Sequence, residues 1–108
     1  MPVPPTKGAL SPGRRWLVEL MQQLNFGRIE NLFVCGGDPV REPPPRVERE
    51  IKFGGENGPR PEAGAADFLL KGQVIELFEH LDQLADGEIA VLEVKHGLPF
   101  RMIVAEVV

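Results

Sequence analysis

The chain has 108 residues, a formal net charge of −4, two histidines and one cysteine. This length indicates one domain, and a single cysteine excludes an internal disulfide. The acidic balance argues against a dedicated nucleic-acid binder, which usually carries a basic excess. The sequence has no apolar run of the ~18 residues that a membrane span needs, and its first residues lack the apolar stretch of a signal peptide. We therefore expect a cytoplasmic protein with no membrane association.

The first residues predict a lead-in followed by a helix. Residues 1 to 10 contain three prolines and no hydrophobic periodicity, which indicates a disordered segment before a single domain over 11–108. Ser11 is a typical N-cap, and Pro12 suits the first helical position because no N–H donor is needed there. The helix is predicted over 12–24, with an apolar stripe formed by Trp16, Leu17, Leu20, Met21 and Leu24.

Two strands are expected after this helix. The first covers 28–35 and ends in a turn at 36–38, where glycine supplies positive φ. Pro43–Pro45 cannot lie inside a paired strand, so the second strand is predicted at 46–53. Its alternation of apolar and charged residues predicts three inward-facing side chains, Val47, Ile51 and Phe53.

A loop rich in glycine and proline is predicted at 54–66, and loops of this length are either functional or mobile. It contributes two candidate contact residues, Asn57 and Arg60. Its glycines are not followed by the Lys-Ser/Thr of a phosphate-binding loop, so the pattern gives little support for phosphate binding.

The second half of the chain predicts a helix and two more strands. Asp67 is a plausible N-cap for a helix over 68–84, and Gly72 inside that helix would cost about 1 kcal/mol relative to alanine. Strands over 88–95 and 98–108 follow, joined by a turn. The apolar stripe of the helix consists of Leu70, Val74, Leu77, Phe78, Leu81 and Leu84.

The two halves are similar in sequence. Residues 27–39 and 87–99 align without gaps and are identical at six of thirteen positions. The preceding helices also match, LVELMQQLN over VIELFEHLD, with the second helix three residues further from its glycine. Such similarity indicates a structural repeat. We expect an α+β fold in which two αββ repeats, 11–53 and 67–108, form a four-stranded, mostly antiparallel sheet with two helices on one face.

The last predicted strand is apolar on both sides. Alternation places Phe100, Met102 and Val104 on one face, and Ile103 and Ala105 on the other. A strand that is apolar on both faces is normally covered on both, and two helices cover only one. We expect proline-rich segments or a second subunit to cover the other face.

The first half also resembles a known family. The helix and strand start Leu20–Ile29, the glycine turn 36–38 and the strand end Glu50–Phe53 resemble the YezD-like family of small bacterial proteins of unknown function. The triple proline departs from the family's pattern, and here the αββ unit occurs twice. The resemblance implies no activity.

No pattern of side chains predicts catalysis. The sequence has no C-x-x-C, H-x-x-x-H or H-E-x-x-H arrangement that would indicate zinc. His80 on the helix flank and His96 in the last turn are typical surface histidines. One alternative is a metal held by Cys35 and His96, because the two turns occupy equivalent places in the repeat. We expect no cofactor and no enzymatic activity.

We therefore expect a binding or assembly module that forms a homodimer or docks a protein partner. The first alternative is a nucleic-acid-associated regulator that uses the sheet and its arginines. The second is an enzyme or ligand carrier that works through the loop at 54–62. The candidate interaction surface consists of Phe100, Met102, Val104, Asn57, Arg60 and His96.

Overall fold

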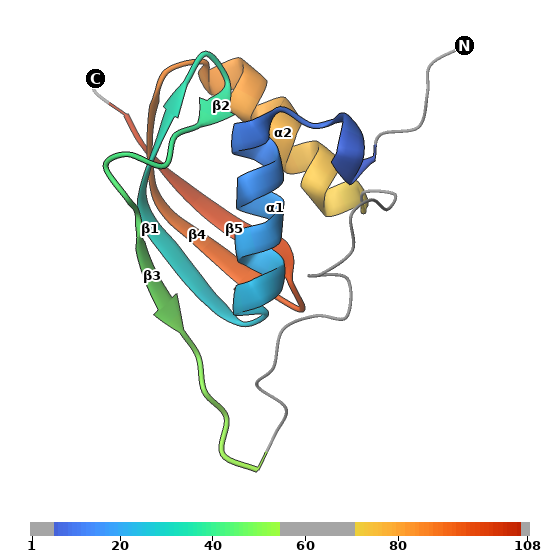
Figure 1. Ribbon diagram of the computed structural model, residues 1–108. Coiled ribbons are helices and arrows are strands. Elements are labelled where there is room, and N and C mark those ends of the chain that lie inside the picture. Colours follow the sequence, from blue (N-terminus) through green and yellow to red (C-terminus); the bar gives the residue numbers. More distant parts are fainter. Residues whose placement is uncertain (1–5, 55–70, 107–108) are drawn as a thin grey trace.

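The protein was analysed as a computed structural model, which describes residues 6–54 and 71–106 (Figure 1). This part of the chain is α+β, with two α-helices and a five-stranded antiparallel sheet. The predicted class is confirmed, whereas the predicted number of strands, four, is wrong. In chain order the elements are a 3-10 helix (Lys7–Ala9), α1 (Pro12–Leu24), β1 (Gly27–Cys35), β2 (Asp38–Pro39), β3 (Arg46–Arg49), α2 (Gly72–Leu84), β4 (Gly87–Lys95) and β5 (Leu98–Ala105).

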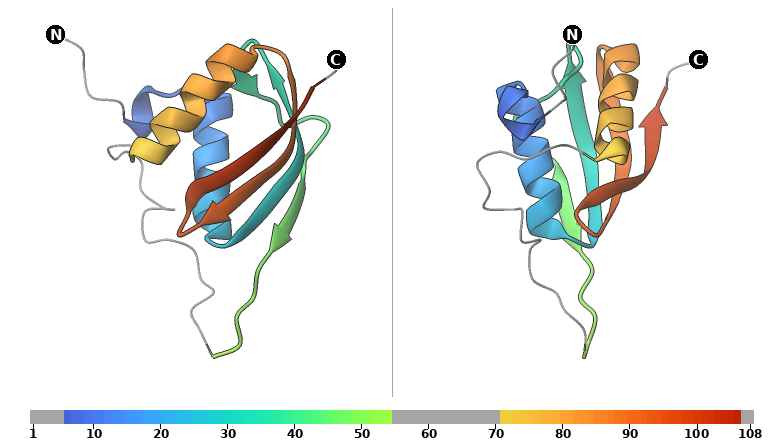
Figure 2. Two further views of the ribbon diagram at one scale, coloured as in Figure 1. Left: turned by 180° about the vertical axis from the view of Figure 1, so that it is seen from behind. Right: turned by 90° about the vertical axis from the view of Figure 1, so that its right-hand side faces the viewer.

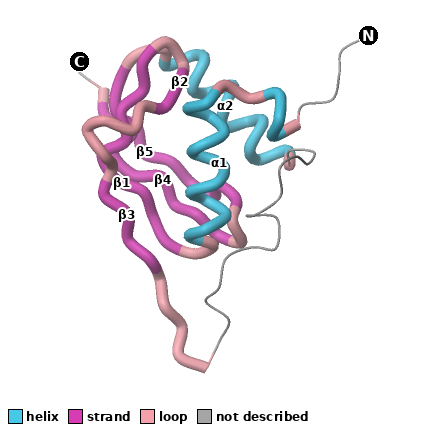
Figure 3. Tube along the Cα trace, in the orientation of Figure 1, coloured by secondary structure: helices cyan, strands magenta, loops and turns pink. Residues whose placement is uncertain are grey.

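Strands β1 and β4 form the centre of the sheet (Figure 3). β5 lies beside β4 at one edge, while β2 and β3 share the other edge, each paired with a different end of β1.

The strand predicted at 46–53 ends at Arg49, and Phe53 is 99% exposed. Val47 and Ile51 are also exposed, so the predicted inward-facing set is wrong. The fifth strand arises because the chain between β2 and β3 carries Pro43–Pro45, which cannot donate to a ladder.

Both helices lie on the same side of the sheet (Figures 1 and 2). They share one core with the strand side chains that point toward them, because successive strand residues alternate between the two faces. The core residues are Leu17, Val18, Met21, Leu24, Ile29, Leu32, Val34, Val74, Leu77, Phe78, Leu81, Ile89, Leu92 and Val94. We call the opposite side of the sheet the outer face.

The start of α1 agrees with the sequence. Ser11 is its N-cap, and the Ser11 hydroxyl accepts a hydrogen bond from the Arg14 N–H at 3.3 Å. The same hydroxyl donates to Asp38 at 2.5 Å, which ties the helix to β2. Residues 6 to 10, predicted to be disordered, are ordered in part: Lys7 lies in the 3-10 helix, is buried, and pairs with Glu19 at 3.2 Å.

Helix α2 begins later than predicted. Lys71 precedes it in an extended conformation, and Gly72 is its first residue. Gly72 is therefore not in the helix interior, and the expected cost of an interior glycine does not apply. The predicted N-cap Asp67 lies outside the described residues.

The helix and the long strand of the first half match those of the second half in length and spacing. α1 and α2 have the same length, and α2 and β4 each begin 60 residues after α1 and β1. The turn after each long strand is hydrogen-bonded to the C-cap of the helix in the other half. Gly37 N–H donates to Ala85 O, after α2, at 2.7 Å, and Gly97 N–H donates to Asn25 O, after α1, at 2.9 Å. Asn25 and Ala85 share an unusual backbone, with φ and ψ of 60° and −58° and of 58° and −71°.

This correspondence corrects the predicted helix alignment. With one constant offset Leu17 corresponds to Leu77 and Met21 to Leu81, and all four side chains are buried. The three-residue shift between the helices is therefore absent.

Candidate functional site

The feature that distinguishes the second half is its uninterrupted last strand. β5 runs from Leu98 to Ala105 at the edge of the sheet, and within the described residues only β4 pairs with it. It ends at Ala105, short of the predicted 108. An edge strand presents a row of backbone N–H and C=O groups that can pair with a further strand.

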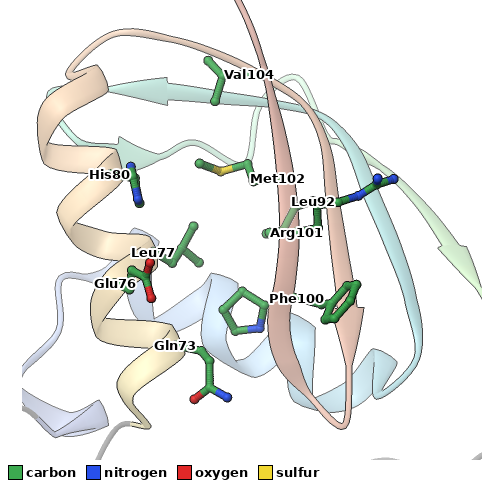
Figure 4. A pocket seen from close by; sticks show the side chains of 10 residues that line it. Gln73, Glu76, Leu77, His80, Leu92, Phe100, Arg101, Met102 and Val104 are labelled. Atoms are coloured by element: carbon green, nitrogen blue, oxygen red, sulfur yellow. The ribbon is translucent and has the colours of Figure 1, made fainter.

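A bulge near the start of β5 changes which side chains share a face. Arg101 pairs with Glu93 and Pro99 pairs with Val94, so Phe100 is one extra residue in β5. In such a bulge two successive residues oppose one residue of the partner strand. Figure 4 shows the Phe100 ring extending from β5 in the direction of Arg101 and away from Met102. The prediction that Phe100 shares a face with Met102 and Val104 is therefore wrong.

A groove of about 370 Å³ separates α2 from β5 (Figure 4). Its base is apolar, whereas the α2 wall carries the polar side chains of Gln73, Glu76 and His80. Met102 extends from β5 toward His80. The lining residues are Gln73, Glu76, Leu77, His80, Leu92, Pro99, Phe100, Arg101, Met102 and Val104. The groove can accept apolar side chains and offers hydrogen-bonding groups along one wall.

A second hollow, of about 380 Å³, continues the groove toward the β4–β5 turn. It shares Gln73, Pro99 and Phe100 with the first and adds Lys95, His96 and Leu98. The His96 ring stacks edge-on against Phe26, with ring centroids 4.7 Å apart. The Lys95 ammonium lies 3.9 Å from the centroid of the Phe100 ring, a cation–π contact.

The outer face of β5 carries two exposed apolar side chains and one arginine that is paired with a carboxylate. Phe100 is 60% exposed and Ile103 is 48% exposed. Between them Arg101 donates two hydrogen bonds to the carboxylate of Glu93, at 3.0 and 3.1 Å. No described segment covers this face of Ile103, where the sequence predicted a cover. Phe100 and Ile103 are the large apolar side chains that the described part of β5 leaves exposed.

The arginines of β1 and β3 make contacts within the protein. Arg28 and Arg46 pair with Glu48 at 3.0 and 3.3 Å. Arg49 donates to the carbonyl oxygens of Gln23 and Leu24 at the end of α1, both at 3.1 Å. Because each charge is balanced by a carboxylate or by helix-end carbonyls, this surface attracts phosphate weakly.

The structure does not bring Cys35 and His96 together. β1 and β4 are antiparallel, with Gly27 opposite Val94 and Val34 opposite Gly87, so the turns that follow them lie at opposite ends of the sheet. The alternative of a shared metal is therefore wrong. In the described part of the chain, no three His, Cys, Asp or Glu side chains are grouped to hold a metal ion. No helix in that part is long and apolar enough to cross a membrane.

Four of the six predicted surface residues border this continuous groove: His96, Phe100, Met102 and Val104. Asn57 and Arg60 lie outside the described residues. The α2 wall was not predicted, because the flank of a helix that carries Gln73, Glu76 and His80 is indistinguishable in sequence from a solvated face.

No protein-family model, no curated protein and no solved structure matches this chain.

Proposed function

We propose that the protein is a non-enzymatic assembly module that associates with another copy of itself through the free edge of β5. The observation that carries this proposal is the difference between the two edges of the sheet. β5 is continuous, and its central residues Met102, Ile103 and Val104 are apolar. Natural proteins interrupt or charge the sheet edges that must stay unpaired.

The opposite edge has those protective features. It consists of two short strands separated by Pro43–Pro45, and β3 has the sequence Arg-Val-Glu-Arg. Prolines and charged side chains discourage the addition of a further strand. β5 has a bulge at Phe100 and a charge at Arg101, but beyond them Met102, Ile103 and Val104 form an apolar stretch with no proline and no charge, which favours association at β5.

The groove beside β5 supports the same proposal. A strand added at β5 would place alternate side chains over the apolar base of the groove. Strand addition of this kind draws affinity from main-chain hydrogen bonds and specificity from pockets for alternate side chains. The paired arginines of the sheet give no comparable support to a nucleic-acid-associated function.

We also take the two halves as copies of one αββ unit, related to the YezD-like family. The constant offset between the halves and the matched turn contacts support this reading. The first copy breaks its second strand at Pro43–Pro45, whereas the second copy keeps that strand in one piece as β5. On this proposal the second strand of the αββ unit is blocked by prolines in the first copy, and in the second copy it stays available for pairing with another chain.

Substituting lysine at Ile103 is expected to abolish self-association. The change puts a charge in the middle of the free edge, and since Ile103 is already 48% exposed the fold should be retained. Light scattering coupled to size exclusion should give a mass near 11.9 kDa for Ile103→Lys and about twice that for the wild type. Val47→Lys, a similarly exposed position on β3, is the matched control and should keep the wild-type mass. A wild type that stays monomeric at high concentration would contradict the proposal.

A further inference from the structure

The part of β5 that can pair regularly with a second strand is short. After the bulge at Phe100, Arg101–Ala105 contains no further extra residue, although β4 opposite it has one near Ala90. Arg101 and Ile103 pair with the outer-face residues Glu93 and Val91, whereas Met102 and Val104 pair with core residues. A second β5 therefore meets one regular ladder of five residues.

Symmetry restricts how two such ladders combine. Residues directly opposite each other in an antiparallel pair project to the same face. In a symmetric pair one residue must therefore lie directly opposite its own copy, with the two-fold axis midway between the two; below, the axis is named by that residue. An axis at Arg101 would place two like charges against each other. An axis at Met102 would place Val104, on the groove side, opposite the bulged Phe100. An axis at Val104 or Ala105 would pair three or one of the five ladder residues. An axis at Ile103 pairs all five residues 101–105 and meets the bulge only beyond them.

We propose that two copies pair β5 with β5 in the antiparallel sense, with Ile103 directly opposite the Ile103 of the other copy across the two-fold axis. This inference rests on the proposed assembly and specifies its geometry. Ile103 meets its own counterpart on the outer face, which covers its exposed side chain. Met102 pairs with the partner's Val104 on the groove side, so apolar side chains from both copies border each groove. Arg101 faces the small side chain of the partner's Ala105, which leaves its pair with Glu93 in place.

The charges of this ladder do not conflict in the proposed register. Arg101 is the charged residue among 101–105, and it comes opposite the partner's Ala105 and not opposite a second arginine. The regular ladder ends one step beyond Ala105, where Glu106 comes opposite the bulged Phe100 of the partner. The absence of like charges opposite each other favours this register over its neighbours.

Disulfide trapping tests this register. In a Cys35→Ser background, Ile103→Cys is expected to cross-link with itself. Arg101→Cys and Ala105→Cys are expected to cross-link when mixed but not when each is alone. Directly opposed residues have Cα atoms about 4.5–5.5 Å apart, inside the range that a disulfide spans. The matched control is Phe33→Cys, on the outer face of the central strand β1. Ile103→Cys should give about tenfold more cross-linked dimer than Phe33→Cys, because two copies of Phe33 are not brought within disulfide distance.

The outcomes separate the register from the assembly. A dimer by light scattering in which Ile103→Cys cross-links no better than Phe33→Cys would overturn the register and leave the assembly standing. Self-cross-linking of Arg101→Cys would likewise overturn it, because it would move the axis. A chain that is monomeric in light scattering would overturn both proposals.

Discussion

Alanine at Gly27 is expected to destabilise the protein by about 2–4 kcal/mol, because the new methyl group has no room and the backbone conformation is unfavourable for an L side chain. A Cβ atom built at Gly27 would lie 2.1 Å from the carbonyl oxygen of Glu48 and 3.1 Å from the Cα of Arg49. Both are backbone atoms of β3, so relief requires β3 to move away from β1. The φ of Gly27 is 155°, which adds strain. Urea denaturation followed by circular dichroism measures the loss.

The equivalent glycine of the second half provides the control. The three atoms nearest to a Cβ at Gly87 all belong to the side chain of Leu84, the closest at 2.9 Å, and the end of a leucine side chain can shift. Gly87→Ala is therefore expected to cost less than about 1 kcal/mol. Equal losses for Gly27→Ala and Gly87→Ala would contradict the close approach of β3 to β1.

Truncating Leu32 to alanine is expected to cost about 3 kcal/mol. Leu32 is fully buried in the central strand β1, opposite Ile89 of β4. Its removal leaves a cavity between both helices and the middle of the sheet, and leucine-to-alanine changes in well-packed cores typically cost about 2–5 kcal/mol. Thermal unfolding should show a midpoint lowered by about 10 °C or more for a domain of this size.

The neighbouring residue is the matched control for Leu32. Phe33 projects to the outer face and is 36% exposed, so Phe33→Ala leaves no enclosed cavity. It should lower the free energy of unfolding by less than about 1.5 kcal/mol despite its larger side chain. A greater loss at Phe33 than at Leu32 would show that the two faces have been assigned the wrong way round.

Local patterns in the sequence predicted most of the secondary structure. The cap at Ser11 and the apolar stripe of α1 follow rules that depend on neighbouring residues, and both are confirmed. The strands β1 and β4 were predicted to within one residue, because each is bounded by glycine. Three residues of the candidate surface, Phe100, Met102 and Val104, come from the same kind of reasoning about β5, and His96 comes from the turn before it.

Features that depend on tertiary contacts could not be predicted. The bulge at Phe100 is set by the register between β4 and β5, and alternation alone assigns its ring to the wrong side. The alternation of 46–53 predicted an inward-facing Phe53, but no element covers that part of the chain within the described residues. Likewise Arg14 joins the halves through Gly37 O and Asp82, a contact between residues far apart in sequence.

Amide hydrogen exchange at two protein concentrations tests most directly the claim that the β5 edge is paired in solution. Our account predicts that the amides of 101–105 that point away from β4 exchange more slowly as concentration rises, because a second β5 protects them. The amides of β3 should exchange at the same rate at both concentrations. Exchange in 101–105 that does not change with concentration, in a protein of monomeric mass, would contradict the account.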